Sequence, residues 1–145
     1  MNNQLLSSKV PPISKFIPGI AWFFLVLILV CIPGDKLPKV DNWLIEFKYD
    51  KLIHVGLFAV LAYLFIHPIT KSTLVLKVKW HYVIKIVIAT AMWGLTTEII
   101  QKFYIPGRSF DLADWAADSL GGLFALLYYK ICLRREIHIP TQNKT

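Results

Sequence analysis

Four long apolar stretches, at residues 16–32, 52–69, 82–100 and 112–133, limit what this chain of 145 residues can fold into. Each approaches the ~20 residues with which an α-helix crosses ~30 Å of hydrocarbon. Backbone groups in lipid must be satisfied within the spanning structure, which leaves helices and closed β-barrels. The stretches lack the alternation of barrel strands, and 56% hydrophobic residues are too many for an ordinary soluble domain. The sequence therefore predicts an all-α, polytopic membrane protein with four transmembrane helices in a compact bundle.

The distribution of lysine and arginine predicts how the helices are oriented. If the N-terminus is cytoplasmic, the inner segments hold ten basic residues and one acidic residue, Glu136. The outer segments then hold six basic and eight acidic residues. Because an excess of lysine and arginine marks cytoplasmic loops, we expect an N-in, C-in topology. The net charge of +7 is then explained by anionic headgroups on the cytoplasmic side rather than by nucleic acid.

The spans divide the chain into three parts. We expect a cytosolic tail at residues 1–15, a membrane domain at 16–133 and a second cytosolic tail at 134–145. The predicted transmembrane helices occupy about 16–33, 51–69, 82–101 and 112–133. No small-x-small cleavage site follows the first span, so we expect it to be retained rather than removed as a signal peptide.

The connections between the spans are also predicted. A loop runs to about Tyr49, and Asp50 then serves as the N-cap of the second span. Residues 70–81 alternate apolar side chains with lysines, which indicates an amphipathic segment on the inner leaflet. Pro106 and Gly107 make the turn between the third and fourth spans.

Ionisable and polar residues gather where the predicted helices meet the outer face of the membrane. If the chain crosses four times, the start of the second helix, the end of the third and the start of the fourth lie on one side. These three ends carry Asp50, Lys51, His54, Glu98, Gln101, Arg108, Asp111, Asp114 and Asp118. Ionisable groups at the hydrocarbon boundary cost energy unless they are paired or line a wet cavity. The sequence therefore predicts a polar site on the outer side.

Some of these residues have an adequate structural explanation. The helix macrodipole favours Asp111 and Asp114 in the first turn of the fourth helix, and Lys51 can extend its ammonium to the interface. Arg108 either pairs with Glu98 or Asp111 and sets the hairpin geometry, or binds the anion of a substrate.

Three residues within a turn or two of the helix ends are harder to explain in that way. The candidate catalytic residues are therefore His54, Glu98 and Asp118. The candidate substrate-binding residues are Lys51, Arg108, Gln101, Asp50, Asp111 and Asp114. Several acids and one histidine without a defined ligand spacing are a loose match to a metal site, so we expect no metal and no cofactor.

The same residues form short motifs. They read Asp50-Lys51-x-x-His54-x-x-x-Phe58, Glu98-x-x-Gln101, Pro106-Gly107-Arg108-x-x-Asp111-x-x-Asp114 and Asp118-x-x-Gly121. In this combination and spacing they resemble the VanZ-like family of bacterial integral membrane proteins, over about residues 20–130. The resemblance implies a multi-pass protein of the bacterial cytoplasmic (inner) membrane. The family's founding member is linked to teicoplanin resistance, which implies a role in the cell envelope without an established biochemical activity.

Three classes of function are open to such a chain. In the first, an outward-facing site binds or modifies an envelope lipid, a lipid-linked glycan or a lipoglycopeptide. Arg108 and Lys51 would then hold an anion, and His54 or Glu98 would act as general base. In the second, a non-enzymatic structural or accessory protein uses its charged residues as an ion network between helix ends. Ion transport is the third and is disfavoured, because the middles of the spans carry no ionisable residues. Membrane lipids are the expected partners.

Overall fold

The structure, a computed structural model, describes residues 9–33 and 43–138. These residues form one short 3-10 helix, η1 (Ile13–Phe16), and four α-helices: α1 (Ile17–Val30), α2 (Trp43–Thr70), α3 (Leu76–Tyr104) and α4 (Leu112–His138). The described ranges contain no strand, which confirms the all-α prediction. Parts of the two predicted tails (1–8 and 139–145) and residues 34–42 between α1 and α2 lie outside the described residues.

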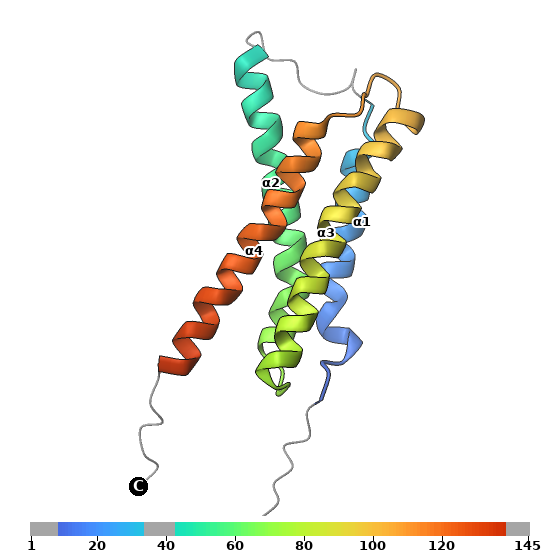
Figure 1. Cartoon of the computed structure of the whole chain (residues 1–145). Coiled ribbons are helices and arrows are strands. Elements are labelled where there is room, and N and C mark those ends of the chain that lie inside the picture. The colour runs from blue at the N-terminus through green and yellow to red at the C-terminus, as the bar shows by residue number, and fades with distance from the viewer. Residues whose placement is uncertain (1–8, 34–42, 139–145) are drawn as a thin grey trace, which may run out of the picture.

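The four helices run alternately in opposite directions (Figure 1). The ends of α1 and α3 lie with the starts of α2 and α4 at one end of the bundle, which we call the site end. The start of η1, the turn between α2 and α3, and the end of α4 lie at the opposite end. The alternation therefore brings the start of α2 to the same end of the bundle as the turn between α3 and α4, as the sequence predicts.

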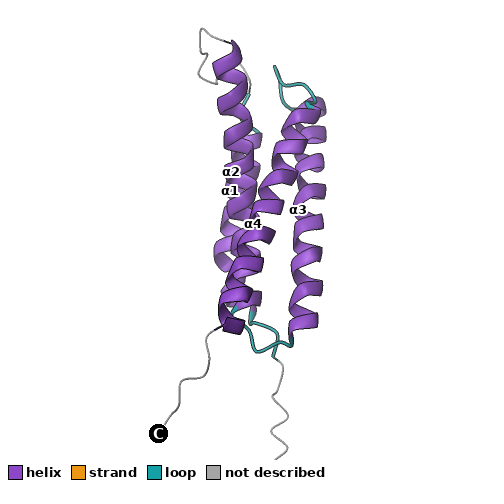
Figure 2. Cartoon of the chain, turned by 60° about the vertical axis from the view of Figure 1, so that its left-hand side comes forward, coloured by secondary structure: helices purple, strands orange, loops and turns teal. Residues whose placement is uncertain are grey.

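Helix α4 is the central packing element for the site. It packs most extensively on α2 and next on α3, while α1 packs mainly on α2 (Figure 2). Gly121 makes the contact with α2 close: a Cβ at this position would lie 2.6 Å from the Val55 carbonyl oxygen and 2.7 Å from the Ala59 nitrogen. Any larger residue would push α4 away from α2, so Gly121 allows the third turn of α4 to pack against the middle of α2.

Two of the predicted helix starts are wrong. Helix α2 begins at Trp43, so Asp50 lies inside the helix instead of capping it, and the predicted loop to Tyr49 is partly helical. Helix α3 begins at Leu76, so the second half of the predicted amphipathic segment is its first turn and a half. The reason is that hydropathy reports only the apolar part of a helix, whereas lysine and glutamate are good helix formers and extend the helix into polar sequence.

The surface of the bundle identifies a membrane protein. By length and composition, the helical segments Ile13–Val30, Tyr49–Thr70 and Leu76–Tyr104 are apolar enough to cross a membrane. Large hydrophobic side chains are exposed along the helices, among them Phe24, Ile28, Ile88, Met92, Phe124, Leu127 and Ile131. Contiguous apolar surface of this kind is rare on soluble monomers and marks contact with lipid or protein. Helix α4 has a comparable length and also exposes large apolar side chains, but its aspartates, glycines and tyrosines make it more polar.

Candidate functional site

The ammonium group of Lys51 joins α2 to the start of α4. Its Nζ lies 2.7 Å from Asp111 Oδ2 and 3.3 Å from Asp50 Oδ2, and it also contacts the Asp114 carboxylate. The Lys51 side chain is only 17% exposed. Lys51 therefore does not act as an interfacial anchor; carboxylates of the protein surround its charge. One ammonium among three carboxylates leaves this part of the site with excess negative charge.

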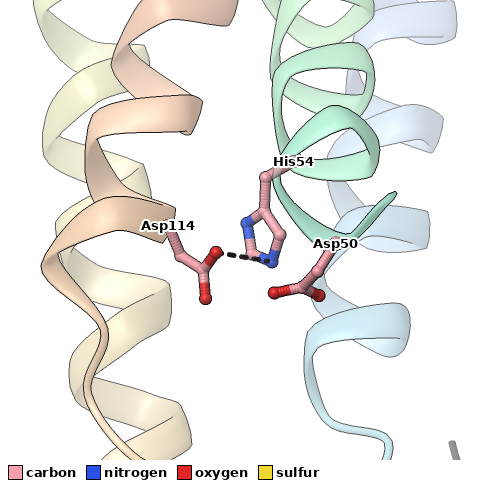
Figure 3. Close-up of side chains that lie close together, drawn as sticks. All are labelled: Asp50, His54 and Asp114. Atoms are coloured by element: carbon pink, nitrogen blue, oxygen red, sulfur yellow. Dashed lines mark ion pairs between the residues drawn. The ribbon is translucent and has the colours of Figure 1, made fainter. Parts of the chain in front are cut away.

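A buried histidine–aspartate pair lies next to the lysine. His54 Nδ1 is 2.9 Å from Asp118 Oδ1, and His54 Nε2 is 4.0 Å from Asp114 Oδ1. Figure 3 shows the imidazole between Asp50 of its own helix and Asp114 of α4. Asp118 is fully buried and His54 is 7% exposed. The pair thus connects α2 to α4 below the layer formed by Lys51.

Glu98 connects α3 to the turn that precedes α4. Its Oε2 accepts a hydrogen bond of 2.8 Å from the backbone N–H of Asp111, and the residue is fully buried. Its second oxygen, Oε1, has no hydrogen-bond partner among the described residues, and the same is true of Asp118 Oδ2. Buried carboxylate oxygens without partners are costly and require an explanation. These two are the main unexplained feature of the site.

Asp111 is the N-cap of α4 and not, as the sequence predicts, a residue of its first turn. Its Oδ1 accepts a hydrogen bond of 2.8 Å from the backbone N–H of Ala113, as an N-cap residue does. The hydrogen bond from Lys51 lowers the pKa of the Asp111 carboxyl below its ordinary value, because the nearby positive charge favours the ionised form. Asp114, in contrast, is 6% exposed and belongs to the buried cluster.

Two predicted site residues lie outside this cluster. Gln101 donates from Nε2 to the Val30 carbonyl oxygen at 3.4 Å, which joins α3 to the end of α1. Arg108 lies in the turn between α3 and α4 and is half-buried. Its Nε is buried without a hydrogen-bond partner, and it forms no ion pair with a residue that the structure describes. The predicted alternative, in which Arg108 pairs with Glu98 or Asp111, is therefore not observed.

Gly94 is a site residue that the sequence reasoning missed. A Cβ at Gly94 would lie 2.7 Å from the Cβ and 2.8 Å from Oδ2 of Asp118. The glycine therefore provides the space in which the Asp118 carboxylate lies against α3. One signal was available: Gly94 precedes Glu98 by four residues, which places both on the same helical face.

The chemistry open to this arrangement follows from its donors and acceptors. A histidine held by an aspartate can accept a proton from a ligand, and an unpaired guanidinium can hold a phosphate or carboxylate. Two sets of three residues also place ligand atoms within 4.8 Å of one another: Asp50, His54 and Asp114, and His54, Glu98 and Asp118. Both sets could hold a metal ion.

Comparison with known proteins identifies the family. The model of the VanZ/LLP1 family matches residues 12–133, a range that contains α1, α2, α3, most of α4 and every residue of the site. No curated protein and no solved structure matches the chain. The family match covers far more than half of the sequence and agrees with the motifs that the structure brings together at the site end. The chain belongs to the VanZ/LLP1 family.

Proposed function

We propose that this protein crosses the bacterial cytoplasmic (inner) membrane four times, with both termini in the cytoplasm, and that its site end faces outward. There the protein binds the anionic head group of an envelope lipid, a lipid-linked glycan or a lipoglycopeptide. If the protein is an enzyme, it also modifies that head group. The observation that carries the proposal is the cluster of buried ionisable residues at one end of an otherwise apolar bundle. Such residues are costly next to hydrocarbon and mark functional sites in membrane proteins.

The polarity of the two ends supports the orientation. Lys71, Lys77 and Lys79 lie at the end opposite the site, together with the start of η1. The acidic residues Asp50, Glu98, Asp111, Asp114 and Asp118 lie at the site end, whereas the opposite end has Glu136, near the end of α4. Cytoplasmic loops are enriched in lysine and arginine, which favours an outward-facing site.

Arg108 is the residue best suited to hold the anion of the ligand. Lys51, the other cation of the site, is already surrounded by carboxylates. Arg108 has a buried Nε without a hydrogen-bond partner and lies in the turn above Glu98 and Asp111. A guanidinium binds phosphate and carboxylate groups through two parallel hydrogen bonds. The His54–Asp118 pair lies deeper and is the candidate general base for any reaction of the bound head group.

The direct test changes Arg108 and measures an envelope phenotype together with protein abundance. In a host whose teicoplanin susceptibility depends on the protein, Arg108→Gln is expected to remove the phenotype at normal abundance. Lys102→Gln is a matched control, because Lys102 is an exposed cation near the same turn, with its Nζ 5.3 Å from the Phe103 ring centre. Loss of phenotype in both variants, or in neither, would contradict a specific role for Arg108.

A structural role is the second candidate, and the ion network favours it. Lys51, His54 and Glu98 connect α2 and α3 to α4 through polar contacts. Removal of one partner from a buried ion pair leaves an uncompensated charge and costs about 3–5 kcal/mol. If the network is purely structural, each variant of His54, Glu98 or Asp118 lowers abundance and phenotype in parallel. If the site binds a ligand, Arg108→Gln separates the two measurements.

A further inference from the structure

The geometry points to a binding site for one divalent transition-metal ion formed by His54, Glu98 and Asp118. The three side chains come from three different helices, α2, α3 and α4, and are all buried. Each offers a ligand atom, and these atoms lie within 4.8 Å of one another. This site is part of the proposed lipid site, but the inference does not depend on a lipid ligand.

The spacing of the donors is close to that of a coordination sphere. Two ligand atoms about 2.1 Å from one ion lie about 3.0–3.4 Å apart at angles of about 90–109°. His54 Nδ1 and Asp118 Oδ1 are 2.9 Å apart. The ligand atom of Glu98 lies within 4.8 Å of the ligand atoms of the other two residues, so Glu98 would have to move closer for all three side chains to bind one ion.

The unpaired oxygen atoms are the second, independent observation. Glu98 Oε1 and Asp118 Oδ2 are buried and have no hydrogen-bond partner in the described part of the chain. Neither carboxylate forms an ion pair with a described lysine or arginine; the one cationic partner, for Asp118, is His54. A protonated His54 supplies one positive charge against two carboxylates. A divalent cation bound by a neutral imidazole balances both charges and provides partners for the unpaired oxygens.

The other set of candidate ligands already holds a cation. Asp50 and Asp114 both contact the Lys51 ammonium. A metal ion there would have to displace a lysine held by three carboxylates. This difference selects His54, Glu98 and Asp118 over Asp50, His54 and Asp114.

The ligand types select the class of ion. Imidazole nitrogen suits zinc and its neighbours in the first transition row, whereas Mg²⁺ and Ca²⁺ prefer oxygen ligands alone. One nitrogen and two carboxylates leave at least one coordination position for water or a head-group oxygen, which is the open form typical of functional metal sites. The sequence alone gave no such indication, because the three ligands follow no short ligand spacing and meet only in the folded bundle.

The test is a titration of the full chain, purified in detergent and stripped with chelator, with Zn²⁺, and with Mg²⁺ for comparison. Calorimetry is expected to show one equivalent of Zn²⁺ and weaker Mg²⁺ binding. Glu98→Gln and Asp118→Asn are each expected to weaken Zn²⁺ binding at least about tenfold, as loss of metal-site partners does. His81→Gln is the matched control: it removes an exposed imidazole near the start of α3, at the end opposite the site, and is expected to bind Zn²⁺ as the wild type does.

The inference is overturned if the wild type binds no stoichiometric Zn²⁺, or if both ligand variants bind it like the wild type. X-ray absorption on the Zn²⁺-loaded wild type decides the matter even if the variants fail to fold. One imidazole with oxygen ligands supports the site, whereas sulfur or several imidazoles would place the ion elsewhere. No envelope lipid is present in these experiments, so their failure leaves the proposed lipid site untouched, and failure of the lipid site leaves the metal result standing.

Discussion

The two halves of the bundle are built from the same helices but have opposite cores. In the half away from the site, the buried cluster is apolar: Ala62, Ile66, Ile69, Val83, Ala125 and Tyr129. At the site end, the buried apolar residues Val30 and Ala117 are accompanied by six buried polar ones: His54, Thr97, Glu98, Gln101, Asp114 and Asp118. Large apolar side chains are exposed in both halves. The two halves thus differ in the polarity of their interiors.

The apolar half of the bundle packs without buried charge among the described residues. Helices in lipid associate through packing and through hydrogen bonds between them, and small residues allow close approach. The apolar half supplies packing, and Gly121 supplies the close approach of α4 to α2. A buried ion pair is weak evidence for stability, because well-packed apolar residues often replace it without loss. The following predictions test whether the charged cluster serves a ligand, as we propose, or the stability of the fold.

The largest effect is expected from separating the His54–Asp118 pair. His54→Leu leaves the fully buried Asp118 without its ion-pair partner and is expected to cost about 3–5 kcal/mol of unfolding free energy. The double variant His54→Leu/Asp118→Leu removes both charges and is expected to regain most of that stability. Denaturant unfolding in detergent measures both values.

The double variant also separates stability from function. The double variant is expected to be stable and to lack the envelope phenotype. At these two positions the interior of the site end would then be apolar, as it is in the other half of the bundle. A double variant as unstable as His54→Leu would show that the pair, and not the uncompensated charge, stabilises the fold. A stable double variant with an intact phenotype would show that His54 and Asp118 are not part of the functional site.

The next effect concerns the apolar half. Ile66 is fully buried, and Ile66→Ala is expected to cost about 2–3 kcal/mol, the low end of the range for such changes in soluble cores. The cost is low because the side chain exchanges protein contacts for lipid contacts, so that mainly the packing energy is lost. Unfolding in detergent gives the value. At matched abundance the phenotype should be unchanged, and a specific loss of phenotype would contradict a functional site confined to the other end.

A change of similar or smaller size is expected where α3 meets Asp118. Gly94→Ala places a methyl group 2.7 Å from the Asp118 Cβ, and such overpacking costs about 1–3 kcal/mol. Gly122→Ala is the matched control, because its Cβ would meet no heavy atom closer than 3.6 Å. The control should be neutral or more stable by up to ~1 kcal/mol, since alanine favours the helix. Thermal unfolding of the two variants measures the difference, and equal effects would contradict a tight fit at Gly94.

The sequence predicted the apolar helices and the meeting of the helix ends, because both follow from hydropathy and alternating topology. It did not predict the helix starts at Trp43 and Leu76, since helices continue past the apolar residues that mark them. The partners within the site could not be derived either. Lys51 binds carboxylates and Arg108 does not, a distinction set by side-chain positions at the α2–α4 contact and in the turn after α3.

Contacts between residues of different helices are also the feature that local sequence spacing predicts least well. The positions of His54, Glu98 and Asp118 on their own helices follow from the period of 3.6 residues. Their mutual approach depends on Gly94 and Gly121, which set how closely α3 and α2 come to α4. Gly94, which leaves space for the Asp118 carboxylate, has no sequence signature beyond its place on the same helical face as Glu98. The approach of His54, Glu98 and Asp118 to one another is therefore visible only in the folded structure.

The smallest predicted effect is a response to pH at the rim of the site end. Lys51 lowers the pKa of Asp111, so the pair stabilises the fold above the ordinary aspartate pKa of about 3.9. That stabilisation is lost as the pH falls from there through the lower pKa of the folded state. Because the Asp111 side chain is 40% exposed, solvent limits the contribution to about 1 kcal/mol or less.

Asp111→Asn keeps a capping side chain and removes the charge. Its midpoint of thermal unfolding should lie below that of the wild type at pH 6, and the gap should narrow at pH 3. If the midpoints of the wild type and the variant differed equally at both pH values, the charge of Asp111 would not contribute to stability. The two halves of the bundle would then differ in charge only at their buried residues.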